Sequence, residues 1–146
     1  MRFGSRMELQ TLLAIAQSVA KESKCVSMGV GAVLVKDGHI LSTGYNGTVK
    51  GATNCCEVHK ERGPEHTEWS LKYEVHAEMN ALLYCPVDTH GSIMVCTHSP
   101  CWNCTKHMIA AGVKEIHYGE TYYREASEYS EVKTFCADNG VVLNEI

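Results

Sequence analysis

The sequence contains no apolar run that approaches the roughly 20 residues of a membrane-spanning helix, and its longest apolar stretches, such as 30–35, are strand-sized. Arg2 and Arg6 are not followed by an apolar segment or a small-residue cleavage site, so no signal peptide is expected. Repeats, low-complexity segments and Ser/Pro-rich linkers are also absent. Together with a 45% hydrophobic content, these features predict one folded domain over residues 1–146, in the cytoplasm and without membrane contact.

Positive charge is also scarce. Thirteen Lys and Arg residues against seventeen Asp and Glu residues give a net charge of −4. A protein that holds a nucleic-acid backbone by bulk charge is usually basic, so this balance weighs against such a partner. It leaves room for a small phosphorylated ligand, which needs only one or two local cations or backbone amides.

Cysteine and histidine are abundant, with eight of each in 146 residues. This cysteine content lies below that of small secreted disulfide scaffolds, and cytosolic thiols stay reduced. A reduced chain that is rich in both residue types is expected to bind metal.

The spacing of apolar residues predicts an α/β fold of three layers, with a five-stranded mixed sheet between helices. Asp37-Gly38 indicates a tight turn in an antiparallel hairpin, and the later alternation of strands and helices predicts parallel pairing. Residues 47–74 lack periodicity and are expected to form a long loop or irregular insertion. The expected helices are 9–23, 74–85, 101–111 and 125–139, and the expected strands are 30–36, 39–45, 92–97, 113–118 and 141–143.

Two short motifs carry the chemistry: His76-Ala77-Glu78 at one helix start, and Pro100-Cys101-Trp102-Asn103-Cys104 at the next. Two cysteines three residues apart at a helix N-terminus can bind one metal as thiolates. His76 would be the third ligand, which leaves the fourth position of a tetrahedral zinc for water. Glu78 is then placed as the general acid/base. This pairing of motifs is typical of zinc nucleobase deaminases, which hydrolyse an exocyclic amino group.

An alternative for the same residues is a closed structural zinc site, in which Glu78 is merely an acidic residue in the first turn of a helix. Such a site usually has four protein ligands. His98 and His107 are the nearest candidates for the fourth position.

The chain resembles the deoxycytidylate (dCMP) deaminases, especially the phage type, along nearly its whole length. The stretches that carry the resemblance are ESKC (22–25), GAVLVKDGHILSTGYNG (31–47), NCC (54–56), HTEWS (66–70), EVHAEMNAL (74–82), SPCWNC (99–104) and GETY (119–122). The resemblance implies the cytidine-deaminase-like fold and a zinc enzyme that converts dCMP to dUMP and ammonia, which supplies dUMP for thymidylate synthesis. Deaminases of free nucleosides have Cys-Ala-Glu at the position of the motif that begins with His76 here. The tRNA adenosine deaminases share His-Ala-Glu, but the segment that precedes it is shorter in them.

The resemblance also implies substrate contacts. Asn46 would bind the deoxyribose, and backbone groups of Ala77 and Ser99 would flank the base. Tyr122 would pack on the nucleotide or reach its phosphate. Lys24 is a candidate for the phosphate contact. The alternative is that Lys24 is an ordinary solvated surface lysine. Asn46 could instead serve the turn before Gly47, and Tyr122 could cover the edge of the core.

A second, structural zinc is implied by positions that match Cys25, Cys55, His66 and Glu74. The lack of periodicity in 47–74 supports it independently, because a metal could order this segment. Cys56 and His59 are spare donors, and the other interpretation is that Cys25 and Cys55 are small buried thiols.

Members of the resembled family are commonly hexameric, and dCTP activates and dTTP inhibits them, with Mg²⁺, at a separate site. A phage source would place this enzyme in the host cytoplasm. Two other functions stay open from the residues alone: a deaminase of tRNA or single-stranded DNA, and a non-catalytic zinc module used in assembly. A polynucleotide deaminase is expected to carry a basic stripe with interleaved aromatic residues, which this sequence lacks. A non-catalytic module would not need the acid/base residue Glu78.

Overall fold

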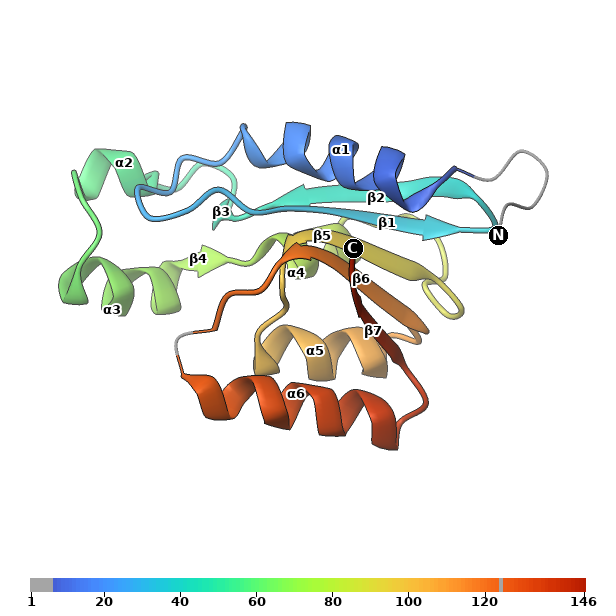
Figure 1. The fold of residues 1–146 in the computed structure, drawn as a ribbon. Helices are drawn as coiled ribbons and strands as arrows, with labels where there is room; N and C mark the ends of the chain where they lie inside the picture. Colours follow the sequence, from blue (N-terminus) through green and yellow to red (C-terminus); the bar gives the residue numbers. More distant parts are fainter. Residues whose placement is uncertain (1–6, 124) are drawn as a thin grey trace.

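A mixed five-stranded sheet forms the middle layer of the fold (Figure 1). The computed structural model describes residues 7–123 and 125–146, so Arg2 and Arg6 lie outside the described part. The strand order is β2-β1-β5-β6-β7, with antiparallel pairing among β2, β1 and β5 and parallel pairing from β5 to β7. The bounds are β1 (Gly31–Lys36), β2 (His39–Tyr45), β5 (Ile93–His98), β6 (Glu115–Glu120) and β7 (Val142–Glu145).

Helices cover both faces of this sheet, which confirms the predicted three-layer α/β/α class. Helix α1 (Leu9–Ala20) packs on one face, where Leu12, Leu13 and Ala16 join apolar side chains of β1 and β5. The other face carries α4 (Ala77–Leu83), α5 (Trp102–Ala110) and α6 (Ala126–Asp138) over the larger part of the core (Figure 1). Within residues 7–123 and 125–146, no helix combines the length and apolar character needed to cross a membrane.

Local chemistry explains the β1–β2 hairpin at one edge of the sheet. The first five residues of β1 are buried, as expected of an apolar, β-branched strand that is covered on both faces. Asp37 and Gly38 both have positive φ angles, 53° and 79°, which suit the tight turn that returns the chain into β2.

Gly44 in β2 allows α4 to approach the sheet very closely. A Cβ atom built on this glycine would clash with the carbonyl oxygen of Ala77 and lie 2.5 Å from the amide nitrogen of Ala81. Both of these are backbone atoms, which cannot rotate away. The absence of a side chain at Gly44 therefore sets the distance between β2 and the start of α4.

The segment 47–74 has more regular structure than the predicted loop. It contains β3 (Gly47–Thr48), α2 (Cys55–Val58) and α3 (Pro64–Tyr73), and β3 pairs with β4 (Glu74–Val75). The prediction of an irregular insertion is wrong for α3, a ten-residue helix with Pro64 in its first turn. Its apolar periodicity is weak because His66 is its one buried residue, so the usual helix pattern is missing from the sequence.

Two helix boundaries differ by a few residues between the prediction and the structure. Helix α4 begins at Ala77 instead of Glu74, because Glu74 and Val75 pair with β3. Helix α1 ends at Ala20 instead of near Ser23. The remaining elements agree with prediction to within two residues, which is the usual uncertainty of helix and strand ends.

Candidate active site and metal-binding clusters

Two helix N-termini bring the first group of metal-ligating side chains together. His76 is the residue directly before α4, Cys101 is the residue directly before α5, and Cys104 lies in the first turn of α5. His76 Nδ1 is 3.3 Å from Cys104 Sγ and 3.4 Å from Cys101 Sγ. The structure thus gathers the three side chains singled out by the two motifs. We call this group the catalytic cluster.

The catalytic cluster has the donors and spacing of a zinc site with an open position. Tetrahedral zinc separates a sulfur ligand from a nitrogen ligand by about 3.6 Å, close to both observed distances. In the described part of the chain, the group contains these three residues. His98 Nδ1 instead bonds with the Thr97 hydroxyl, and His107 Nδ1 donates to the Asn103 carbonyl. The alternative of a closed site with His98 or His107 as fourth ligand therefore gains no support from the geometry.

The Cys101 and Cys104 side chains shift each other's pKa in opposite directions. A hydrogen bond from the Cys104 thiol, together with His76, lowers the pKa of the Cys101 thiol to about 4. The same hydrogen bond and burial raise the pKa of Cys104. The low pKa favours the thiolate form of Cys101, which is the form that binds a metal.

Glu78 lies beside this cluster, in the first turn of α4. The residue is only 4% exposed, and burial raises the pKa of its carboxyl to about 7, although the nearby His76 acts in the opposite direction. It also interacts with the Cys104 thiol. A buried carboxyl that can gain or lose a proton near neutral pH has the property that a general acid/base requires.

Ala77 and Ser99, the residues expected beside the base, are close in sequence to the catalytic cluster, since Ala77 follows His76 and Ser99 lies two residues before Cys101. Ala77 is fully buried at the start of α4. The Ser99 hydroxyl donates to the Tyr122 carbonyl at 2.9 Å and accepts from the Tyr122 amide at 2.8 Å. These bonds tie the loop after β6 to the loop that carries Cys101. Tyr122 is 41% exposed, whereas its neighbour Tyr123 packs against the main core.

Asn46 fixes the backbone of the loop before β1. Its Oδ1 accepts from the Val30 amide at 2.8 Å, and its Nδ2 donates to the Met28 carbonyl at 2.9 Å. Each group is used once, and an amide side chain has a second N–H and a second lone pair. Lys24 is exposed on the same connection between α1 and β1.

A second group of donors forms where the connection after α1 meets α2, α3 and β4. His66 Nε2 lies 3.1 Å from Cys55 Sγ, 3.5 Å from Cys25 Sγ and 3.7 Å from Glu74 Oε1. The Cys25 thiol also donates to Glu74 Oε1 at 3.4 Å. The four residues matched to a second zinc thus do converge. We call them the insertion cluster.

The chemistry of the insertion cluster fits a buried cation. Cys55 and His66 are buried, and Glu74 Oε2 is buried without a hydrogen-bond partner in the described structure. Burial raises the pKa of the Cys25 thiol to about 11. Two sulfurs, an imidazole and a carboxylate are zinc ligands, and a cation here would satisfy the unpaired oxygen.

The two spare donors stand outside this group. Cys56 is exposed, whereas the neighbouring Cys55 is buried. The His59 ring packs edge-on against His66, with 5.4 Å between ring centroids, and against Trp69. His59 thus packs against His66 and is not one of the four converging donors.

The sequence reasoning missed Glu128. Its carboxylate accepts a 2.8 Å hydrogen bond from the amide of Trp102, the residue that follows Cys101. No local pattern could have shown this contact, because 26 residues separate the two partners and only the packing of α6 on α5 joins them.

Comparison with known proteins agrees with this geometry. The model of the cytidine and deoxycytidylate deaminase zinc-binding region matches residues 6–120. The deoxycytidylate deaminase of enterobacteria phage T4 is 36% identical over 163 aligned residues, which cover 86% of this chain and 84% of the phage protein.

Solved structures give the same result. The dCMP deaminase of cyanophage S-TIM5 in its apo form has a TM-score of 0.75 and 31% identity, and the match covers 96% of this chain and 100% of the other. Its complex with dCMP and dUMP has a TM-score of 0.75 and 33% identity, with 94% and 95% coverage. The predicted resemblance is confirmed, and the chain belongs to the cytidine and deoxycytidylate deaminase family.

Proposed function

We propose that the protein is a dCMP deaminase, which hydrolyses dCMP to dUMP and ammonia and thereby supplies dUMP for thymidylate synthesis. The observation that carries this proposal is the buried Glu78 carboxyl beside three convergent zinc donors. The similarity to phage enzymes of that name supports the choice of substrate.

The catalytic cluster supplies the metal ligands in this proposal. His76 Nδ1 and the sulfurs of Cys101 and Cys104 would hold the zinc, whose chemical contribution is to acidify a bound water. Glu78 would take one proton from the attacking water and give it to the ring nitrogen of the base. It would then take the proton left on the added oxygen and give it to the amino group, which departs as ammonia. Its pKa of about 7 suits both directions of transfer.

Nucleotide contacts complete the site. Backbone groups of Ala77 and Ser99 flank the base, and the remaining N–H and lone pair of Asn46 bind the deoxyribose. Tyr122 packs on the nucleotide or reaches its phosphate, since its ring is partly exposed. Lys24, exposed on the connection after α1, is the candidate phosphate contact.

The insertion cluster holds a second zinc with a structural role. Cys25, Cys55, His66 and Glu74 come from four different parts of the chain, and one cation would join them. Both clusters need reduced thiols, which supports a cytoplasmic location, in the host cell if a phage encodes the chain.

Regulation and assembly follow from the resemblance. We place activation by dCTP and inhibition by dTTP, each with Mg²⁺, at a site separate from the catalytic cluster, in a homo-hexamer. Exposed apolar side chains near the end of α4 support self-association, since Leu83 and Tyr84 are each 67% exposed and Val87 is 55% exposed.

An ammonia-release assay tests the proposal directly. Purified protein is given dCMP, deoxycytidine, CMP or a single-stranded oligonucleotide, each with and without dCTP–Mg²⁺ or dTTP–Mg²⁺. We expect turnover of dCMP alone, raised by dCTP and lowered by dTTP. Deamination of the oligonucleotide without turnover of dCMP would move the protein to the polynucleotide deaminases, and no turnover of any substrate would favour a zinc module without catalysis.

A further inference from the structure

The first turn of α5 carries both sulfurs of the catalytic cluster, those of Cys101 and Cys104. The first amides of a helix lack partners within the helix and need acceptors from elsewhere. Here Cys101 Sγ accepts from the Cys104 amide at 3.4 Å, so one acceptor is itself a metal-binding atom. The Trp102 amide lies between the two cysteines, and its acceptor comes from another helix.

That acceptor is Glu128 in the first turn of α6. Its Oε2 lies 2.8 Å from the Trp102 amide nitrogen, a length typical of a strong hydrogen bond to a charged acceptor. Glu128 is half-buried, and its charge helps to raise the pKa of the neighbouring Tyr123. The carboxylate thus points inward from α6 toward the peptide that follows Cys101.

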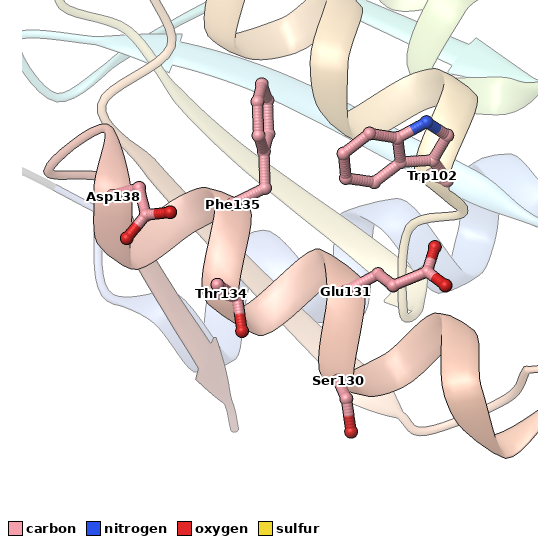
Figure 2. Close-up of a pocket in the computed structure, with 6 residues that line it drawn as sticks. All are labelled: Trp102, Ser130, Glu131, Thr134, Phe135 and Asp138. Carbon is pink, nitrogen blue, oxygen red and sulfur yellow. The ribbon is translucent and has the colours of Figure 1, made fainter.

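A second contact reinforces this connection seven residues further along α6. The ring of Phe135 packs edge-on against the Trp102 ring, with 4.9 Å between centroids and an interplanar angle of 64°. Figure 2 shows Phe135 and Glu131 extending from α6 toward Trp102, and all three residues line one pocket. Helix α6 therefore holds both the backbone and the side chain of the residue that follows Cys101.

We propose that Glu128 is a positioning residue for the catalytic cluster, which orients the Cys101 and Cys104 sulfurs by fixing the Trp102 peptide. Groups that hold the ligands of a metal in place commonly affect metal affinity or activity by 10- to 100-fold when they are removed. The proposal rests on the catalytic cluster being the zinc site. It does not require that dCMP is the substrate.

A test needs a signal from this site that is independent of turnover. The chain has two tryptophans, and Trp69 lies next to the insertion cluster. A Trp69→Phe background leaves Trp102 as the single tryptophan, between two ligands of the catalytic cluster. With Co²⁺ as a quenching metal, the recovery of Trp102 fluorescence after addition of a chelator gives the rate of metal loss from that cluster.

Four variants in this background separate the hydrogen bond from other effects of the substitution. We expect Glu128→Ala to release metal about ten-fold faster than the parent. Glu128→Gln keeps an oxygen that can accept from the Trp102 amide and should stay within about three-fold of the parent. Glu128→Asp keeps the charge but is too short to reach, so it should behave like the alanine variant. Glu131→Ala, on the same helix and exposed, is the matched control and should release metal at the parental rate.

The proposal is overturned if Glu128→Ala releases metal no faster than Glu131→Ala, or if Glu128→Gln loses metal as fast as Glu128→Ala. Should the alanine variant not fold, the glutamine and aspartate variants decide alone, since the proposal requires the aspartate variant to be the faster of the two. The turnover of dCMP, measured separately after reloading with zinc, should show a lower kcat for Glu128→Ala with KM unchanged. Failure of dCMP turnover in the parent would count against the proposed substrate and leave the metal-release comparison intact.

Discussion

The catalytic cluster and the insertion cluster contain similar donors on very different supports. The catalytic cluster stands at the N-termini of α4 and α5, which bury Ala77, Ala81, Cys104 and Met108 against the sheet. The insertion cluster joins short elements whose burial is slight, since His66 is the one buried residue of α3 and Cys55 that of α2. The packing of helices on the sheet therefore positions the donors of the catalytic cluster. In the insertion cluster, the donors themselves make up most of the buried side chains of α2 and α3.

The largest expected effect separates chemistry from metal binding in the catalytic cluster. Glu78→Gln should lower kcat for dCMP by about 10⁴-fold, because an amide cannot exchange the proton that the carboxyl transfers. The zinc content should stay at the parental level, since His76 and the two cysteines are intact. Activity is followed by ammonia release and metal by elemental analysis. Near-full activity of this variant would contradict the role given to Glu78.

Removing a ligand from the insertion cluster should instead affect folding. We expect Cys55→Ala to lose one zinc per chain and about 3 kcal/mol of unfolding free energy, the size of the linkage to a metal present at a hundred-fold excess over its dissociation constant. Denaturant unfolding and metal analysis measure both quantities. Cys56→Ala, on the exposed side of the same short helix, is the matched control and should change neither. An equal loss of zinc in both variants would show that the ligand set is wrong.

Gly44 offers a way to disturb the catalytic cluster through its packing alone. Gly44→Ala places a Cβ against backbone atoms of Ala77 and Ala81, so α4 must shift, at a destabilisation of about 1–3 kcal/mol. The shift should also lower kcat, since α4 carries His76 and Glu78. Gly47→Ala is the control, because a Cβ there meets no atom within 4 Å. Thermal unfolding and steady-state kinetics on both variants check the prediction, which fails if the two variants are indistinguishable.

The smallest expected effect concerns the phosphate. Lys24→Ala should raise KM for dCMP by about five-fold with kcat unchanged, because an exposed charge contact contributes up to about 1 kcal/mol. High salt should reduce the difference. Lys21→Ala, an exposed lysine at the end of α1, serves as the control. An unchanged KM in the Lys24 variant would assign it to the solvated surface.

The sequence predicted most strongly what depends on local pattern. The hairpin at Asp37-Gly38, the helix that begins next to Cys101 and the chain order of the five main strands follow from periodicity and turn chemistry, and the structure agrees with them. Helix α3 was missed because its stability does not come from an apolar stripe. Glu128 was missed because its contact depends on how α6 lies on α5, which no spacing within one segment records.

The contact between Cys25 and Glu74 spans 49 positions of the chain. In polymer terms, a metal held by both ends would close a loop, and the entropic penalty of closure grows only as the logarithm of loop length. Doubling the intervening segment would add only about 0.6 kcal/mol to that penalty. Within this span β1 and β2 belong to the main sheet, so the part that can change in length is the insertion between β3 and β4. The pairing of β3 with β4 keeps its two ends joined, so new surface can be added there without disturbing α4.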